Sequence, residues 1–233
     1  MNLIDDFNFA LPNVCLITDD PYRVKMIAAH YLDKVKVFTE TRGQVGLIGE
    51  FNNIPLTVLS VGIGKASTIS YLTELYSKNE IKRIVYLGDC VTNDSSLPVG
   101  SITYISKAYE NDKFYAASEN LLKDLEVIIR KNNIQAQACI TTTNDNYFIE
   151  KKYIASQESR VLDFATSAIY KFNKNYTNSE TLSILNVCEN IIANEKIDEA
   201  QRQSGCHSAI MLALHTAIFN AAWDNYFSFD DND

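Results

Sequence analysis

Short apolar runs alternate with segments of helical period along most of the chain, and this alternation constrains the fold more than any other feature. Strands are expected at Val14–Thr18, Gly46–Gly49 with Phe51, Leu56–Val61, Arg83–Gly88, Ile102–Ile105, Ala136–Thr141 and Leu182–Val187. Helices are expected at Pro21–Leu32, Ala66–Lys78, Glu119–Lys131 and about Glu199 to Asp224. The order predicts an α/β fold, a single-domain three-layer sandwich with a central mixed, largely parallel sheet.

Length and composition narrow the class of protein. A chain of 233 residues can bury one full core, so we expect a single domain over residues 1–233 that ends in an acidic tail at about 226–233. A net charge of −8 argues against a nucleic-acid partner, which would need clustered Lys and Arg. No apolar run approaches the length of a membrane span and no signal peptide is evident, which predicts a cytoplasmic protein without a membrane partner.

The cysteines and histidines give no signal for a metal or a cofactor. Five cysteines are scattered with no CxxC pair, which is typical of reduced, buried thiols. The three histidines lack a second ligand at a useful spacing, so no metal site is expected. No cofactor is expected either.

The turn after the first strand carries contradictory charges. Pro21 begins a helix and Arg23 follows in its first turn, an arrangement that presents N–H groups and a guanidinium to an anion. Asp19 and Asp20 place two negative charges where that anion would lie. In parallel sheets ligands bind at the carboxyl ends of strands, so we expect the loops after Thr18, Val61 and Gly88 to converge on one cleft.

Six stretches in order resemble the nucleoside phosphorylases of the purine and uridine phosphorylase type. They are TDDPYRVKMIA, TRGQVGLIGEFNNIPLTVLSVGIGKAS, ELYSKNEIKRIVYLGDC, LPVGSITYI, VLDFATSAIY and QRQSGCHSAIMLAL. Two stretches, SVGIG and TTTNDNYF, look nearer the uridine branch. The resemblance implies cleavage of an N-glycosidic bond by phosphate, an enzyme class of pentosyltransferase, and self-association as a dimer or hexamer.

The resemblance also implies an altered phosphate pocket. Arg23 is retained, and Arg42 matches an arginine that the partner subunit supplies in the family. Asp19 stands where the family has glycine, Tyr86 where it has arginine, and Asp89 where it has a hydroxyl residue. A charge pair about 4 Å apart is worth roughly 4 kcal/mol at an effective dielectric near 20, so one lost attraction and two added repulsions disfavour phosphate. We expect Asp19 and Asp89 to pair with Arg23 or Arg42 instead.

The sugar site implied by the resemblance is altered as well. The family signature is close to Glu-Met-Glu, whose second Glu holds the ribose hydroxyls. Here the residues are Asp163, Phe164 and Ala165, so the hydroxyl ligand is replaced by a side chain that cannot form a hydrogen bond. Phe164 can still pack against a sugar or a base. For Asp163 the alternative to contact with a ligand is a capping or pairing role in the core near Ser167.

At the base site the resemblance implies a general acid. Glu189 stands where purine members carry an Asp that protonates the leaving base, and Arg202 matches a basic residue near that acid. Tyr147 and Phe148 lie where the family stacks an aromatic side chain on the base.

Three functions stay open on the sequence. One is a divergent family member that binds a nucleoside- or nucleobase-like ligand, with ordinary phosphorolysis weak or lost. The second is an active phosphorylase or nucleoside hydrolase with an unusual substrate, in which Asp19 or Asp89 acts as general base toward water. The third is a structural or storage protein that keeps only the fold.

Overall fold

The computed structural model describes residues 2–145, 158–198 and 206–220. Its strands are β1 (Val14–Thr18), β2 (Asp33–Thr39), β3 (Gly46–Phe51), β4 (Ile54–Ser60), β5 (Arg83–Thr92), β6 (Ile102–Glu110), β7 (Lys113–Ala116), β8 (Ala136–Thr143), β9 (Val161–Asp163), β10 (Glu180–Asn190) and β11 (Glu195–Lys196). Its helices are α1 (Pro21–Tyr31), the short 3₁₀ helix η1 (Thr41–Gly43), α2 (Lys65–Lys78), α3 (Glu119–Asn132), α4 (Thr166–Tyr176) and α6 (His207–Ile218).

The strands of the described part form one mixed sheet. At its centre β4, β1, β5 and β10 lie side by side and run parallel, as the alternation of strands and helices predicted. The antiparallel pairs lie toward the margins, where β3 joins β4 and β2 forms an edge. The predicted α/β class with a central mixed sheet is confirmed.

The sheet also closes on itself at one side. Strand β10 pairs with both β5 and β6, β6 pairs with β8, β8 with β9, and β9 returns to β5. These five strands therefore form a ring, which the apolar pattern along the chain does not reveal. Closure removes exposed strand edges on this side.

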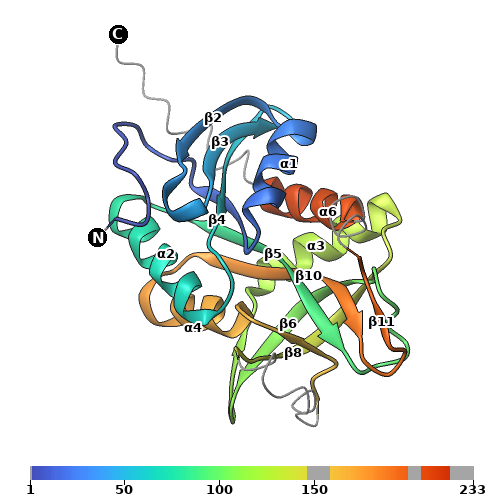
Figure 1. Ribbon diagram of the computed structural model, residues 1–233. Helices are drawn as coiled ribbons and strands as arrows, with labels where there is room; N and C mark the ends of the chain where they lie inside the picture. Colours follow the sequence, from blue (N-terminus) through green and yellow to red (C-terminus); the bar gives the residue numbers. More distant parts are fainter. Residues whose placement is uncertain (1, 146–157, 199–205, 221–233) are drawn as a thin grey trace.

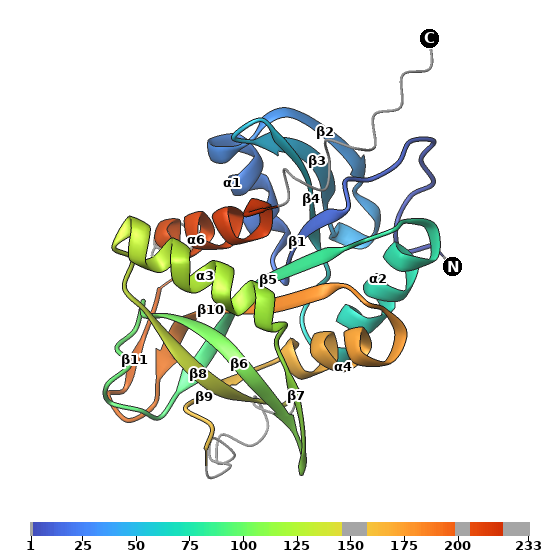
Figure 2. The same ribbon diagram turned by 180° about the vertical axis from the view of Figure 1, so that it is seen from behind.

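The helices cover the sheet in two groups (Figures 1 and 2). Helices α1, α3 and α6 lie together, with α6 against β1, β5 and β10. Helices α2 and α4 pack on each other on the other side. Strand β1 is buried over its whole length, which fits its uninterrupted apolar sequence.

Several boundaries differ from those expected. Strand β5 runs on from Gly88 to Thr92, because it gains partners in both β10 and β9 there, so the expected loop directly after Gly88 is wrong. Helix α6 ends at Ile218 and not near Asp224. Asn220 adopts a left-handed backbone with φ 60°, and the Phe219 N–H bonds to the carbonyl of His215.

Several elements were not expected from the sequence: helix α4, the short helix η1 and the strands β2, β7, β9 and β11. The edge strand β2 is mostly exposed, so its alternating valines look like surface residues. Helix α4 is buried on nearly all sides of its first two turns, and its exposed residues lie only toward its carboxyl end.

Candidate functional site

The loop between β1 and α1 places Arg23 beneath the carboxyl end of the sheet. Strand β1 ends at Thr18, and the Asp20 side chain begins α1 by accepting a hydrogen bond from the Tyr22 N–H, 2.8 Å. One helical turn later, the Arg23 side chain is only 2% exposed. The fold therefore holds a guanidinium in the sheet's interior, where it requires partners.

Arg23 finds those partners on both neighbouring strands. Its Nη1 donates to Thr18 Oγ1 (3.0 Å), to Asp19 Oδ1 (3.2 Å) and to the Leu87 carbonyl (3.2 Å). Its Nη2 donates to both oxygens of Asp89, each at 3.0 Å. Thr18 is paired with Leu87 in the sheet, so Asp89 lies just beyond the end of β1. The ion pairs expected from the sequence are present.

Arg23, Asp19 and Asp89 form a cluster in which the guanidinium is in contact with both carboxylates. Burial raises the pKa of Asp19 to about 6. The charge of Arg23 lowers this pKa, but the charges of Asp89 and Asp20 raise it. The Asp19 and Asp89 side chains are 11% and 14% exposed. In the described part of the chain no residue donates a hydrogen bond to Asp19 Oδ2.

Tyr86 lies two residues before Gly88 on the same face of β5, and its ring runs over that glycine. A Cβ at position 88 would lie 2.4 Å from the Tyr86 Oη, so only glycine leaves room for the phenol. Tyr86 is 1% exposed. Burial raises its pKa well above the ordinary value, and the charge of Asp19 raises it next most strongly. Among the described residues its hydroxyl has no hydrogen-bond partner.

Two thiols and one further carboxylate border the cluster. The Cys206 thiol forms a hydrogen bond with Arg23. The charge of Arg23 and this hydrogen bond lower the thiol pKa, but burial has the larger effect and keeps the pKa above its ordinary value. Burial raises the pKa of Cys188 to about 12, and the charges of Asp89, Glu189 and Asp19 add to this. Glu189 is therefore at the same edge of the sheet as the cluster.

The residues aligned with the sugar site serve the fold in this structure. Asp163 is fully buried, and its oxygens accept hydrogen bonds from the Thr141 and Thr143 hydroxyls and from the Ala165 and Thr166 N–H groups at the start of α4. Its Oδ1 thus serves the two threonines and its Oδ2 the start of α4, which is the capping role given as the alternative, and contact with a ligand stays a prediction. Ala165 is 1% exposed.

Phe164 packs with Val91 and Leu162 in a small apolar cluster that the partly buried Cys188 and Ile191 border. This cluster is separate from the main core. Phe164 therefore lies near the Cys188 thiol, at the same edge of the sheet as Glu189.

Arg42 lies apart from the Arg23 cluster. It is exposed, in η1, with a left-handed backbone of φ 58° and ψ 27°. Gly43 beside it also has a positive φ of 77°. Among the described residues Arg42 forms no ion pair, so within one chain it is not part of the Arg23 cluster.

Tyr147, Phe148 and Arg202, the other residues predicted for base binding, lie outside the described residues. Sequence reasoning missed Thr18 and Cys206 as partners of Arg23. The position of Thr18 at a strand's carboxyl end was an available signal, whereas Cys206 is separated from Arg23 by most of the chain.

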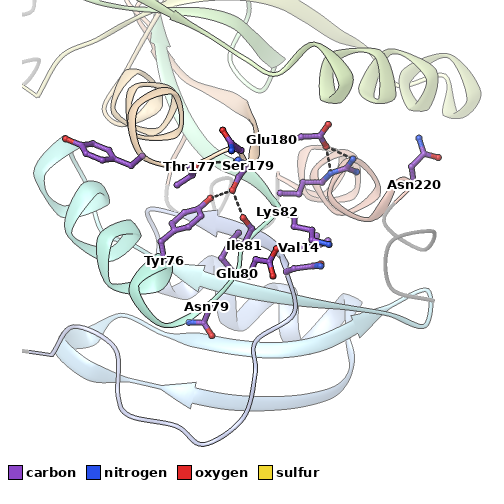
Figure 3. A pocket seen from close by; sticks show the side chains of 14 residues that line it. Val14, Tyr76, Asn79, Glu80, Ile81, Lys82, Thr177, Ser179, Glu180 and Asn220 are labelled. Atoms are coloured by element: carbon purple, nitrogen blue, oxygen red, sulfur yellow. Dashed lines mark hydrogen bonds and ion pairs between the residues drawn. The ribbon is translucent and has the colours of Figure 1, made fainter. Parts of the chain in front are cut away.

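A cleft opens at the amino ends of the same strands (Figure 3). It encloses about 880 Å³ and is bordered by the first residues of β1, β5 and β10, which are Val14, Arg83 and Glu180. Arg83 donates to Glu180 Oε2 from Nε (3.0 Å) and Nη2 (2.7 Å). Tyr76 donates to Ser179, which in turn donates to the Ile81 carbonyl. The resemblance points to none of these residues.

Within the described ranges, no three His, Cys, Asp or Glu side chains gather as a bound metal ion would require. No described helix combines the length and the apolar character that crossing a membrane requires.

Comparison with known proteins gives a consistent result. Residues 13–150 match the family described as the phosphorylase superfamily. A DeoD-type purine nucleoside phosphorylase of Bacillus velezensis is 27% identical over 220 residues, covering 88% of this chain and 94% of the relative. One from Buchnera aphidicola is 26% identical over 228 residues, covering 90% and 94%.

A solved structure has the same fold. The purine nucleoside phosphorylase of Toxoplasma gondii in complex with immucillin-H superposes with a TM-score of 0.79 at 19% identity, covering 89% of this chain and 90% of that one. These named relatives are purine enzymes, whereas two sequence stretches favoured the uridine branch.

Proposed function

The chain belongs to the phosphorylase superfamily, and from that premise we propose that it binds a nucleoside- or nucleobase-like ligand while ordinary phosphorolysis is weak or lost. The cleft at the carboxyl ends of β1 and β5 is the proposed place, since parallel sheets bind ligands there. Glu189, Phe164, Tyr86 and the Arg23 cluster are its proposed lining.

One observation carries the proposal: the Nη donors of Arg23 are already engaged. A guanidinium has two N–H bonds on each Nη. Here Nη1 faces three acceptors of the protein, and Nη2 faces both oxygens of Asp89. Phosphate would have to displace a carboxylate from a buried, charge-assisted pair to reach them.

Net charge supports the same proposal. With both carboxylates ionised, Arg23, Asp19 and Asp89 together carry −1. An arriving phosphate dianion would meet repulsion from two carboxylates that are each in contact with the guanidinium, at a site where water screens weakly.

The test measures binding and chemistry separately. Thermal unfolding is followed with nucleosides, nucleobases and phosphate, because a ligand of the folded state raises the melting temperature in proportion to ln(1 + [L]/Kd). Base release from the same nucleosides is then measured with and without phosphate. We expect stabilisation by at least one nucleoside or base, and no acceleration by phosphate. Phosphate-dependent base release would overturn the proposal.

A second candidate is a nucleoside hydrolase, and the raised pKa of Asp19 favours it. A carboxylate with a pKa of about 6 and a free oxygen can take the proton of a water molecule. The water oxygen would bond to the anomeric carbon, the C–N bond would break, and Glu189 would protonate the departing base. Phosphate-independent base release that Asp19→Asn abolishes and Asp20→Asn leaves intact would establish this candidate.

Self-association is part of the proposal. Named relatives are nucleoside phosphorylases, and the resemblance implies that a partner subunit supplies Arg42. The exposed, left-handed backbone of Arg42 supports this role, since strained residues persist where structure or function requires them. Light scattering should give a dimer or a larger assembly at micromolar concentration, and a monomer would contradict it. A protein that no nucleoside or base stabilises would instead be one that keeps only the fold.

A further inference from the structure

We infer that the Arg23 cluster accepts a cationic group, so that the ligand of this cleft is a nucleoside-like molecule that carries a protonated amine. This inference rests on the proposed function, because it concerns the same cleft. It goes further by naming which chemical group the cluster recognises.

Two polar atoms at the cluster lack a hydrogen-bond partner among the described residues. Asp19 Oδ2 receives no hydrogen bond from any described residue, and its side chain is 11% exposed, so a ligand can reach it. The Tyr86 hydroxyl belongs to a side chain that is 1% exposed, and it too has no described partner. Since the Tyr86 side chain has little access to water, a bound group that forms a hydrogen bond with its hydroxyl is favoured.

Both atoms can accept a hydrogen bond, and the Tyr86 hydroxyl can also donate one. A carboxylate oxygen only accepts, and a phenol oxygen accepts as readily as it donates. The donors nearby are already used, since the Nη atoms of Arg23 face Thr18, Asp19, Leu87 and Asp89. The free atoms therefore fit a ligand group that donates hydrogen bonds.

Charge selects among such donors. A hydroxyl or amide would satisfy the hydrogen bonds and leave the cluster at −1, whereas an ammonium would also neutralise it. Glu189 is on the same edge of the sheet, and Asp20 lies next to Asp19 in the chain, so the surrounding charges favour a cation further. A metal ion is a poorer fit, because the described residues offer no set of three ligands.

The experiment compares matched nucleosides. Adenosine and uridine are titrated beside their 3′-amino-3′-deoxy and 5′-amino-5′-deoxy derivatives, which differ from the parents by one amine. Calorimetry at pH 7 and at low salt measures each Kd for the unaltered protein and for three variants. Asp19→Asn keeps the shape and removes the charge, Tyr86→Phe removes the hydroxyl, and Asp20→Asn is the matched control on the helix cap.

We expect at least one amine to bind tenfold or more tightly than its parent nucleoside. Asp19→Asn should reduce that preference to less than twofold, and Tyr86→Phe should weaken the amine severalfold, while Asp20→Asn keeps it. Equal binding of amine and parent, or a preference that survives Asp19→Asn, would overturn the inference and leave the proposed function in place. If neither parents nor amines bind, the inference is overturned, and the proposed function fails as well if no nucleobase raises the melting temperature.

Discussion

Two arginines, at opposite ends of the same sheet, are each held between two carboxylates. At the carboxyl end Arg23 pairs with Asp19 and Asp89. At the amino end Arg83, the first residue of β5, pairs with Glu180 (2.7 Å) and Asp124 (3.4 Å). The ion pairs look alike, so an arginine between two carboxylates does not by itself mark a binding site.

What differs is the rest of each arginine's surroundings. Arg83 Nη1 also donates to the carbonyls of Thr216, Ala217 and Phe219, and so caps the carboxyl end of α6. Glu180 and Asp124 are held in turn by Asn120 (2.9 Å) and Asn220 (3.1 Å). The fold thus supplies partners to Arg83 and both of its carboxylates, whereas among the described residues neither Asp19 Oδ2 nor the neighbouring Tyr86 hydroxyl has a hydrogen-bond donor. This difference separates a structural clamp from a candidate site.

The largest expected effect is the loss of Arg83. Arg83→Met should reduce the free energy of unfolding by about 3–5 kcal/mol, because it leaves two carboxylates and the end of α6 without a cation. Arg23→Met at pH 7.5 should cost about 2–3 kcal/mol, since the two carboxylates that it pairs with are partly exposed to water. Urea unfolding measures both.

Acid should separate these two variants further. At pH 5 the loss of unfolding free energy in Arg23→Met should shrink to about 1 kcal/mol, because Asp19, whose pKa burial raises to about 6, takes up a proton, whereas the carbonyls of α6 cannot be protonated. If both variants lose the same unfolding free energy at both pH values, the distinction between a structural role for Arg83 and a binding site at Arg23 is lost.

The next effect concerns Asp19 and the pH dependence of stability. Its pKa is about 6 in the folded chain against an ordinary 3.8, so the folded state binds more protons between those values. Stability from this group is therefore greatest below pH 4 and is lost as the pH rises through 6. Asp19→Asn should flatten this slope and stabilise the protein at pH 7.5 by about 1–3 kcal/mol.

Asp124→Asn is the matched variant in the other cluster. Burial raises the pKa of Asp124 too, but Arg83 and the Asn220 amide lower it. Asp124→Asn should therefore change the pH dependence of stability less than Asp19→Asn does. Urea unfolding from pH 4 to pH 8 tests both variants. An unchanged slope in Asp19→Asn would show that Asp19 is already charged in both states.

A smaller effect is the recovery of anion binding. Asp19→Gly with Asp89→Ser frees the Nη donors of Arg23 and should give phosphate binding in the millimolar range, with Tyr86 still limiting it. The equivalent change at Arg83, Glu180→Gln with Asp124→Asn, should give none, because the carbonyls of α6 keep its Nη1. Calorimetry decides between the outcomes, and binding by the Arg83 variant would mean that any freed arginine suffices.

The fold was predictable because its strands and helices carry regular patterns. Val14–Thr18 and the start of α1 at Pro21 emerged as expected, since an apolar run and a helix-starting proline are local signals. The closure through β9 and the buried α4 were not, because they depend on pairing between residues far apart in the chain.

The candidate site was predictable only in part. The pairing of Arg23 with Asp19 and Asp89 followed from charge, since a buried cation needs anions. Cys206 and the free Tyr86 hydroxyl could not be foreseen, because side-chain contacts between distant segments depend on packing. The contacts of Asp163 depend on packing in the same way, because its Oδ2 accepts from the start of α4 and its Oδ1 from Thr141 and Thr143 on β8.

The central claim is that the Arg23 cluster has replaced the bound anion. Calorimetric titration of the unaltered protein with inorganic phosphate at pH 7.5 tests it most directly, supported by the melting temperature in the same buffer. No saturable heat up to about 10 mM phosphate, and an unchanged melting temperature, are predicted. Saturable binding at sub-millimolar concentration would contradict the claim, and the protein would then be an ordinary phosphorylase with an unusual pocket.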